Sequence, residues 1–428
     1  KFITPILVAF EHKRLFPGEL GPMTGEMGCY DEKTEVLTKS GWKFFKVLDY
    51  ADEICTLNPN GHGIEFHRPT ALVKYRHHKK LLTVRNQTLD IAVTLDHNMY
   101  VCGQRSAKGG KLKFGFVKAK DLEYQSVIKR TGKWSGSEEN VFELPSVIKS
   151  HYEGRGVVAS ITKKIKIPMD EWLAFMGIWL SDGFTSGKYQ VGIAQKIPSK
   201  TAAIEKLLQK TPFKFKRSRE QFYAHNKQLH SYLTVFGKAP EKHVPPFIKN
   251  LSPRQIKIFL EWYALGDGTI MNGGFRIFYT TSKKMADDLQ ELLLKIGRVG
   301  IIKKRRRRGK IWIKDHFANS SRPQYEVLER VKKSDSWIDK RDIKIINYTG
   351  KVYCATVKNH IVYVRRNGKP YWCGNTSMFW SEPNVLFAET TGKMEENLRN
   401  AGYVGYIDIN CIVNGRGIYP LEFTCRFG

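Results

Sequence analysis

Two breaks in the chain, at Cys29 and at Asn375-Thr376, carry residue types that can cut and rejoin a polypeptide. If the segment from Cys29 to Asn375 is removed, Gly28 is followed directly by Thr376 and the flanks read continuously. A thiol at the start of such a segment can attack the preceding carbonyl, and a hydroxyl after its end can take over the acyl group. The Asn side chain can cyclise and release the chain. These residues therefore predict a segment that excises itself.

Two apolar segments that end in Asp-Gly form a second candidate site. Residues 172–183 and 258–268 share this design, with Asp182 and Asp267 as their last acidic residues. One such helix is common, because Asp-Gly also ends ordinary helices. Two of them packed side by side would bring two carboxylates together, and these repel unless they hold a divalent cation. A divalent cation held there can activate water and stabilise a leaving oxygen.

Short strands and turns are predicted to position the first site. Residues 34–38 and 42–44 flank a turn at 39–41 and predict a hairpin, and residues 81–84 and 91–94 continue an all-β pattern. Between residues 168 and about 344 the pattern changes to helices and basic strands, so the second site is expected in an inserted α+β domain.

A short motif, Thr94-x-x-His97, ends one of the predicted strands. Alone, such a histidine is most often packed in a core. Together with Cys29 and Asn375-Thr376, it resembles the splicing motifs of inteins, which are self-splicing elements of the all-β Hint fold. The resemblance covers about residues 29–128 and 348–375, and it includes the segments 117–122, 350–364 and 372–375.

This resemblance implies a role for each residue and no cofactor for splicing. Cys29 is the first nucleophile, His97 is the acid that protonates the leaving nitrogen, and Thr94 is a hydrogen-bonding stabiliser. Thr376 then attacks the thioester. Asn375 cyclises to a succinimide, and a final shift from oxygen to nitrogen joins the flanks.

The sequence departs from the intein pattern at two positions. Gly374 stands where His usually precedes the last Asn, so His360 is expected to supply the proton transfer for Asn375. Cys354 stands where Asp is usual. We expect Cys354 to be a modulator or an alternative nucleophile, beside the standard route through Cys29.

The two Asp-Gly segments resemble the paired motifs of LAGLIDADG homing endonucleases. The resemblance implies catalytic and metal-binding roles for Asp182 and Asp267, with Mg²⁺ as the cofactor. Residues 242–248 and 279–290 resemble further blocks, and Lys242 is a candidate catalytic or phosphate-contacting residue.

A large positive charge favours a nucleic-acid partner. Lys and Arg number 71 against 41 Asp and Glu, which gives a net charge of +30. The expected partner is double-stranded DNA at the uninterrupted host-gene junction, bound through phosphate contacts and read in the major groove. The candidate contact residues are Lys214, Lys216, Arg217, Arg219, Lys303, Lys304, Arg305, Arg306, Arg307 and Arg308.

The two flanks resemble parts of phosphoribosylamine–glycine ligase, an α+β ATP-grasp enzyme. The predicted order is therefore a host fragment at 1–28, the first splicing region at 29–130, the endonuclease with linkers at 131–345, the second splicing region at 346–375 and a host fragment at 376–428. The alternatives are a splicing element whose nuclease only binds DNA, and a ligase fragment with an inert insertion.

The composition also indicates in which cellular compartment the protein is expected. No segment offers the roughly 20 uninterrupted apolar residues of a membrane span. The seven cysteines contain no CxxC pair and form an odd, scattered set, which argues against a zinc site and a disulfide framework. We therefore expect a cytoplasmic monomer in a reducing compartment.

Overall fold

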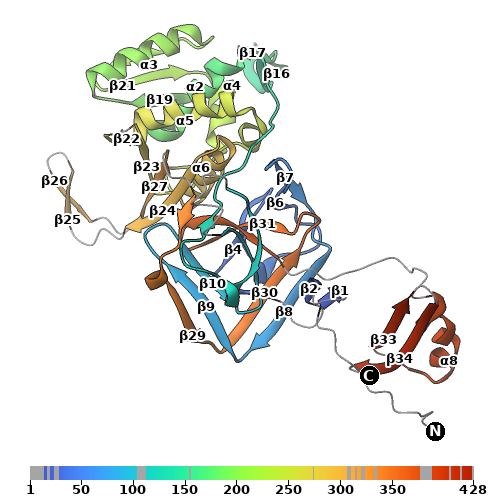
Figure 1. The fold of residues 1–428 in the computed structure, drawn as a ribbon. Coiled ribbons are helices and arrows are strands. Elements are labelled where there is room, and N and C mark those ends of the chain that lie inside the picture. Colours follow the sequence, from blue (N-terminus) through green and yellow to red (C-terminus); the bar gives the residue numbers. More distant parts are fainter. Residues whose placement is uncertain are drawn as a thin grey trace. The chain divides into compact units, whose positions relative to one another are not determined.

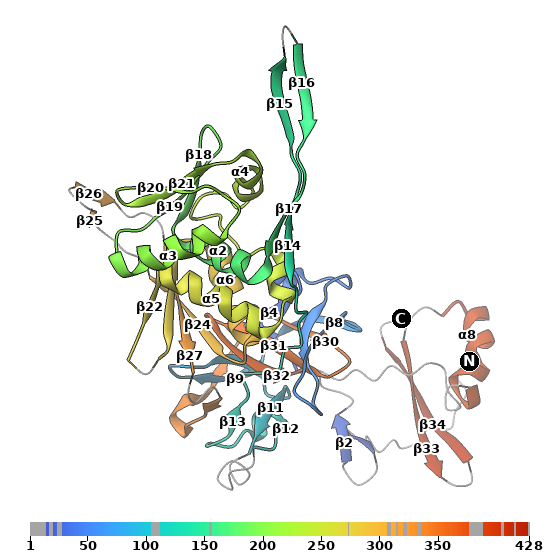
Figure 2. The same cartoon turned by 90° about the horizontal axis from the view of Figure 1, so that it is seen from above.

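The computed structural model describes most of the chain between residues 14 and 426. The described residues are 14–16, 20–23, 28–103, 112–153, 156–272, 274–305, 310–313, 316–319, 323–331, 335–375, 388–403, 406–414 and 417–426. The chain divides into two compact units, drawn in Figures 1 and 2. One unit is Gly28–Thr376, and the other combines Lys1–Met27 with Ser377–Gly428. Each boundary lies within one residue of a predicted excision junction.

Within Gly28–Thr376, residues 28–130 and 335–375 form a β-rich part built from two six-stranded sheets and one four-stranded sheet. The first sheet has the order β29-β9-β10-β3-β30-β8, and the second has β32-β31-β4-β6-β7 with β5 paired to β4. Almost all neighbours are antiparallel. The strands of the first sheet are β3 (Tyr30–Asp31), β8 (Ala71–His77), β9 (Lys80–Arg85), β10 (Asp90–Thr94), β29 (Ile343–Asn347) and β30 (Gly350–Thr356).

The second sheet contains the predicted hairpin. Its strands are β4 (Glu35–Thr38), β5 (Gly41–Phe44), β6 (Ile54–Leu57), β7 (Ile64–His67), β31 (Ile361–Arg366) and β32 (Lys369–Gly374). The strands β11 (Asn98–Cys102), β12 (Gly115–Lys118), β13 (Val127–Ile128) and β28 (Ser336–Trp337) form the four-stranded sheet. Because β3, β30 and β32 belong to these sheets, the start and the end of the segment 29–375 meet in one core.

Residues 131–331 form a helical part in which two long helices run side by side (Figure 2). These are α2 (Met169–Asp182) and α5 (Pro253–Asp267), and each ends at the Asp of its Asp-Gly pair. Gly177 and Gly266 permit the close approach: a Cβ added at Gly177 would lie 2.6 Å from the Phe259 carbonyl oxygen, and one at Gly266 would lie 2.0 Å from Ser181 Oγ. The two helices approach closely although Trp262 stands in α5 where a packing glycine is usual, and Trp262 Cβ lies 2.8 Å from where a Cβ on Gly177 would be.

A four-stranded sheet follows each long helix. The first, β18-β19-β21-β20, contains β18 (Gly183–Ser186), β19 (Gln190–Ala194), β20 (Lys216–Ser218) and β21 (Gln221–His225). The second, β22-β23-β27-β24, contains β22 (Gly268–Ile270), β23 (Arg276–Thr280), β24 (Val299–Arg305) and β27 (Gln324–Arg330). Three shorter helices complete the two halves: α3 (Pro198–Lys210), α4 (Lys227–Thr234) and α6 (Lys283–Lys295). Hairpins β14–β17 (Val141–Leu144, Ile165–Pro168), β15–β16 (Ile148–Glu153, Gly156–Ile161) and β25–β26 (Lys310–Ile313, His316–Asn319) extend from this part.

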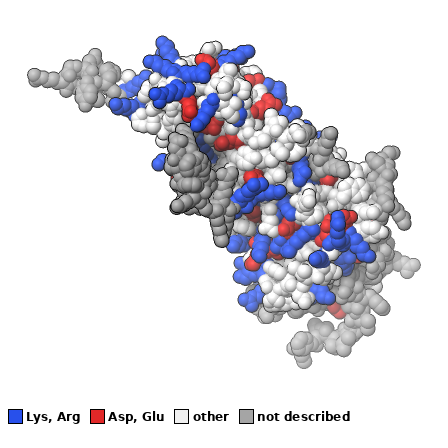
Figure 3. Space-filling view, turned by 90° about the vertical axis from the view of Figure 1, so that its left-hand side faces the viewer, with Lys and Arg blue, Asp and Glu red and all other residues white. Residues whose placement is uncertain are grey.

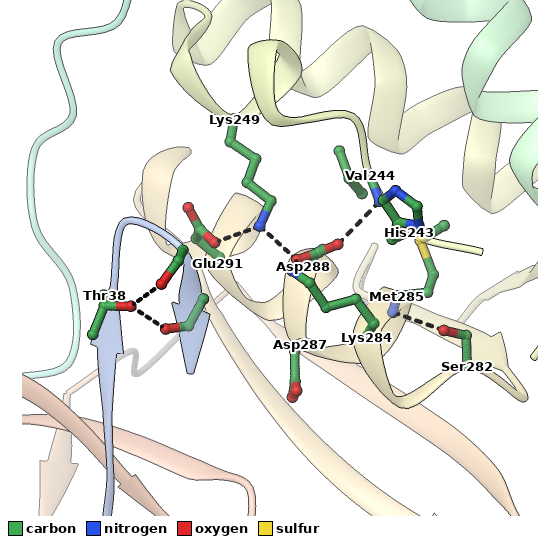
Figure 4. Close-up of polar contacts among 12 residues, drawn as sticks. Thr38, His243, Val244, Lys249, Ser282, Lys284, Met285, Asp287, Asp288 and Glu291 are labelled. Carbon is green, nitrogen blue, oxygen red and sulfur yellow. Dashed lines mark hydrogen bonds and ion pairs between the residues drawn. The ribbon is translucent and has the colours of Figure 1, made fainter. Parts of the chain in front are cut away.

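Helix α6 is held in the helical part by a buried ion cluster (Figure 4). Lys249 Nζ lies 2.5 Å from Asp288 Oδ1 and 3.0 Å from Glu291 Oε2. Glu291 also pairs with Lys295 at 2.7 Å. Burial alone would lower the pKa of Lys249, but the two carboxylates outweigh it and raise that pKa. Removing Glu291 would leave the buried Lys295 ammonium without its carboxylate partner, so the cluster fixes α6 in place.

A neighbouring face of α6 contacts the β-rich part at Arg365, which is 1% exposed. Its guanidinium binds Glu35 (Nε–Oε2 2.7 Å) and Asp287 of α6 (Nη1–Oδ1 2.5 Å). Gln290 Oε1 accepts a further bond at 2.8 Å. At the turn of the hairpin, the carbonyl of Gly368 accepts from Ile302 N of β24 at 3.0 Å and from Gln290 Nε2 at 2.9 Å. The hairpin β31–β32 is therefore clamped at its turn by the helical part.

The structure differs from the predicted boundary at residue 345. Strand β28 pairs with β13, and β29 pairs with β9, so the β-rich part already resumes near residue 335. Strand β29 is a mostly exposed edge strand without a clear alternation of apolar and polar residues, which explains why its sequence did not mark the change.

The flanking unit contains short paired elements. Strands β1 (Arg14–Phe16) and β2 (Leu20–Met23) pair, and β33 (Tyr406–Asn414) pairs with β34 (Gly417–Arg426) after α8 (Glu395–Asn400). The register places Asn414 opposite Gly417 at one end of this pair. Residues 1–13 lie outside the described residues. Among the residues that the structure describes, none of the helices has the length and apolar character needed to cross a membrane.

Candidate active sites

The start of the removable segment is held by Thr94 at the end of β10. Cys29 is fully buried, and its backbone N donates to Thr94 Oγ1 at 2.9 Å. In return, Thr94 N donates to the Cys29 carbonyl at 2.9 Å. Thr94 thus contacts the nitrogen of the peptide bond between Gly28 and Cys29.

His97 lies fully buried beside both junctions. A Cβ added at Gly28 would be 2.2 Å from His97 Cα, so only glycine fits at this close approach. Burial lowers the pKa of His97 to about 4, although backbone groups of Gly28 and Gly374 act in the opposite direction. Nε2 lies 3.5 Å from the sulfur of Cys373. His97 is therefore a neutral imidazole at neutral pH.

The thiol of Cys29 has a hydroxyl and a second thiol as neighbours. Burial raises its pKa, the nearby Cys354 raises it further, and a hydrogen bond with Tyr75 lowers it. Cys354 is 2% exposed on β30 and reaches the same core. Both predicted sulfur groups are thus brought together, and Cys29 is protonated at neutral pH.

The end of the segment is held by four contacts to Asn375, which is fully buried. Its Nδ2 donates to the Ala355 carbonyl at 3.0 Å, and its Oδ1 lies 3.2 Å from His360 Nδ1. Its backbone N donates to the His360 carbonyl at 3.1 Å. Its backbone carbonyl accepts from Asn98 Nδ2 at 3.0 Å. The structure therefore brings His360 to Asn375, where it was predicted, whereas Thr376 lies outside the described residues.

Tyr30 links the two junctions. Its hydroxyl donates to the Gly374 carbonyl at 2.5 Å, and its ring packs edge-on against His97 with the centroids 4.3 Å apart. Sequence reasoning missed Tyr30, Tyr75 and Asn98. Tyr30 and Asn98 directly follow Cys29 and His97, and this adjacency is the available signal, whereas Tyr75 comes from β8 and nothing in the sequence marks it.

The second site lies at the ends of α2 and α5, where Asp182 and Asp267 come together. Burial raises the pKa of Asp267 to about 7, and the nearby Asp182 contributes to the same shift. Burial also raises the pKa of Asp182, whose Oδ2 accepts from Gln195 Nε2 at 2.9 Å. The charge of Asp182 thus opposes ionisation of Asp267, as the sequence predicted.

Two lysines supply positive charge beside this pair. Lys242 Nζ donates to the carbonyls of Trp179 at 3.0 Å and Gly183 at 2.7 Å. Burial lowers the pKa of Lys242 to about 8, although Asp267 and Asp182 act to raise it. Lys200 Nζ donates to the Gly266 carbonyl at 3.2 Å. A cavity of about 170 Å³ opens here, and its lining includes Ser181, Lys242, Tyr263, Asp267 and Gln324.

The donor set at this site fits a divalent cation that is shared with a substrate. Among the described residues, no cluster of three or more His, Cys, Asp or Glu side chains is placed to hold a metal ion. The two half-buried carboxylates are unstable as a doubly ionised pair, which a divalent cation would relieve. Asp182 and Asp267 would hold it, and the remaining oxygen ligands would come from water and phosphate.

The predicted DNA-contact residues lie on different faces. Lys303 and Arg305 alternate with Ile302 and Lys304 along β24, and Ile302 packs in the core with α6. Lys303 and Arg305 therefore lie on the face away from α6, where Arg305 pairs with Glu326 at 2.9 Å, whereas Lys304 lies on the α6 side.

In the half of the helical part that contains α2, Arg217 contacts other residues of the protein. It lies 3.4 Å from Glu205 of α3 and over the ring of the buried Phe222. Lys216 and Arg219 are exposed, and Lys214 is exposed at a pocket of about 540 Å³ that is also lined by Glu205 and Leu208 of α3. Lys and Arg side chains are prominent on the face in Figure 3. Arg306, Arg307 and Arg308 lie outside the described residues.

Comparison with known proteins gives one family match. Residues 254–332 match the model of a LAGLIDADG-like domain, so this segment, which includes α5 and Asp267, is LAGLIDADG-like. Two curated relatives are 27% identical over 290 residues (an ATP-dependent Clp protease proteolytic subunit of Chlamydomonas moewusii) and 25% identical over 401 residues (a DNA-directed RNA polymerase subunit beta C-terminal section of Stigeoclonium helveticum). The matches cover 64% and 81% of this chain, but only 28% and 36% of those proteins.

Similar solved structures fall into two groups. A bacterial intein-like domain from Clostridium thermocellum is 17% identical, with 33% of this chain and 79% of that chain covered and a TM-score of 0.21. I-DmoI in complex with DNA and Mn is 12% identical, with 39% and 92% covered and a TM-score of 0.27. The PabCDC21-1 intein is 17% identical, with 33% and 82% covered and a TM-score of 0.20.

Proposed function

We propose that residues 29–375 excise themselves from the chain and join Gly28 to Thr376. One observation carries this proposal: Cys29 and Asn375, the first and last residues of the segment, are both fully buried in a shared core with His97. Tyr30 bridges them through the Gly374 carbonyl. Residues at opposite ends of a long segment have no structural need to meet around a histidine, but joining the flanks requires it.

The first step replaces an amide by a thioester. The Cys29 sulfur bonds to the Gly28 carbonyl carbon, the bond to the Cys29 nitrogen breaks, and the thiol proton ends on that nitrogen. Because His97 is neutral, with a pKa of about 4, it must accept a proton before it can donate one. His97 therefore relays the proton from the Cys29 thiol to the leaving nitrogen, and it is not already protonated before the reaction. Thr94 orients that nitrogen.

The later steps transfer the acyl group and release the segment. The Thr376 hydroxyl attacks the thioester, which forms an ester and returns the proton to the Cys29 sulfur. Asn375 Nδ2 then attacks its own carbonyl carbon, the bond to Thr376 breaks, and a succinimide remains. The ester finally shifts from oxygen to the freed nitrogen of Thr376. The bonds to Ala355 and His360 orient the Asn375 amide for its attack.

Expression of the whole chain tests this proposal. Mass spectrometry should find the 29–375 segment and a short product in which Gly28 is bonded to Thr376. Replacing both Cys29 and Asn375 by Ala should leave the chain intact. A parent chain that stays intact under refolding and reducing conditions would refute splicing.

We also propose that the helical part is a site-specific endonuclease that cuts both strands of the uninterrupted junction. The match to a LAGLIDADG-like domain and the paired Asp182 and Asp267 support this role. A divalent cation bound there, Mg²⁺ in our proposal, would activate water and stabilise the leaving oxygen. Lys242 holds positive charge beside the carboxylates, and the exposed Lys216, Arg219, Lys303 and Arg305 contact phosphates.

The relatives support a mobile element. The two curated relatives have the names of different proteins, a protease subunit and an RNA polymerase subunit, as expected when one element occupies different hosts. The flanks of this chain would then be fragments of its own host, for which we propose an ATP-grasp ligase. A plasmid that bears the empty junction tests cleavage: cutting that needs Mg²⁺ supports the nuclease, whereas binding without cutting supports a degenerate one.

A further inference from the structure

We propose that Asn98 is a catalytic residue for release of the segment, and that it stabilises the oxyanion formed when Asn375 cyclises. This inference rests on the splicing function proposed above. Asn98 Nδ2 donates to the Asn375 carbonyl oxygen at 3.0 Å. A carbonyl oxygen can only accept, so the amide nitrogen of Asn98 must be the group that faces it.

That oxygen is where charge develops in the reaction. When Asn375 Nδ2 bonds to its own carbonyl carbon, the carbon becomes tetrahedral and its oxygen becomes negative. The charge disappears when the bond to Thr376 breaks. The proton that Asn375 Nδ2 loses is balanced by one that the leaving nitrogen of Thr376 gains. A donor already fixed within hydrogen-bond distance of this oxygen lowers the barrier, and it needs no rearrangement during the step.

The neighbourhood of Asn98 also explains why glycine precedes Asn375. A Cβ added at Gly374 would lie 2.3 Å from the Asn98 carbonyl oxygen and 2.9 Å from Asn98 Cβ. No side chain fits at position 374 while Asn98 occupies this place. The sequence has no helper directly before Asn375, and the structure assigns one that comes from β11 instead.

The residues that contact Asn375 act on different atoms during cyclisation. His360 Nδ1 reaches the side-chain oxygen of Asn375, and the Ala355 carbonyl accepts from its Nδ2, so both act on the attacking amide. Asn98 acts on the carbonyl that is attacked. Loss of His360 and loss of Asn98 should therefore slow the same step through different atoms.

The test measures cyclisation alone, in the full chain with Cys29→Ala. Release of the fragment that begins at Thr376 is followed by mass spectrometry. Asn98→Ala should slow it about 100-fold, the usual effect of removing one oxyanion donor. Asn98→Asp keeps the shape but loses the donor at pH 8, so it should be at least as slow. The exposed Asn347→Asp of β29 is the matched control and should keep the parent rate.

A pH series separates catalysis from structure. As pH falls, the carboxyl introduced by Asn98→Asp becomes protonated and can donate again, so its rate relative to the parent should rise. Gly374→Ala should also slow cyclisation, because its Cβ displaces Asn98. A second assay, thiol-induced cleavage before Cys29 in the chain with Asn375→Ala, reports whether the fold survives the Asn98 substitutions.

The outcomes are distinct. The proposal is overturned if Asn98→Asp cyclises within twofold of the parent at pH 8. It is also overturned if both Asn98 variants lose both reactions at every pH, since that pattern means a structural role. If Asn375→Ala still releases the Thr376 fragment, the splicing function itself fails, and this inference fails with it.

Discussion

Replacing Asp267 by Asn should abolish DNA cleavage and yet make the helical part more stable at alkaline pH. Asp267 has a pKa of about 7 in the folded chain, against an ordinary value of 3.8. Between these values the folded state binds the proton and the unfolded state does not, so stability falls as pH rises. Above pH 7 the folded chain carries the whole cost of an ionised carboxylate beside Asp182.

The size of the effect follows from the two values. At ~1.4 kcal/mol for each pH unit between them, the cost is about 4 kcal/mol at pH 8 and roughly 2 kcal/mol at pH 5. This pKa already includes the attraction of Lys242 and Lys200, which lowers it. The amide that replaces the carboxylate is not charged in either state. Asp267→Asn should therefore raise the melting temperature of this part by ~5 °C more at pH 8 than at pH 5.

Thermal unfolding of a chain that cannot splice, with Cys29→Ala and Asn375→Ala, is the assay. Asp170→Asn on α2 is the control: Asp170 pairs with Arg254, which lowers its pKa, so this change should stabilise at neither pH. Mg²⁺ should stabilise the parent at pH 8 but not the Asp267 variant. If Asp267→Asn raised the melting temperature equally at both pH values, or lowered it at pH 8, the electrostatic reasoning would be refuted.

Three further predictions concern single steps. Cys29→Ala should block cleavage before residue 29 but keep slow release after Asn375; full ligation by mass spectrometry would point to Cys354 as first nucleophile. His360→Ala should let thioester or ester intermediates accumulate on gels, because Asn375 loses the donor to its Oδ1, and unchanged cyclisation would contradict this. Gln at both Lys303 and Arg305 should weaken DNA binding and reduce the salt slope by about 2, and an unchanged slope in titrations would exclude them as phosphate contacts.

Much of both sites was predictable because their chemistry dictates residue types at defined places. A leading thiol, a closing Asn and two Asp-Gly helices could be found without any knowledge of contacts. Asn98 and Tyr75 could not, because their roles depend on β11 and β8 reaching the junctions from elsewhere in the sheets. An ordinary Asn at the start of a strand carries no pattern that separates an oxyanion donor from a surface residue.

The pattern of basic residues in the sequence also predicted only part of the structure. The basic runs predicted strands, and the strands are present at β20 and β24. However, alternation along a strand sends neighbouring residues to opposite faces. Arg217 therefore pairs with Glu205, and Lys304 lies on the α6 side, although both belong to the runs that predicted DNA contacts. Which residues of such a run face outward depends on which of their neighbours pack into the hydrophobic core. The sequence of the run alone does not show this.

The clamp on hairpin β31–β32 has an evolutionary consequence. This hairpin ends at Gly374 and so carries Asn375, while its turn is held by Asp287, Gln290 and Ile302 of the helical part. A lineage that no longer gains from cutting DNA is free to lose Asp182 and Asp267. It is not free to lose α6 or β24, because Arg365 would keep its buried charge without half of its partners. Genetic decay should therefore erode the nuclease from its active site and spare the residues that brace the hairpin.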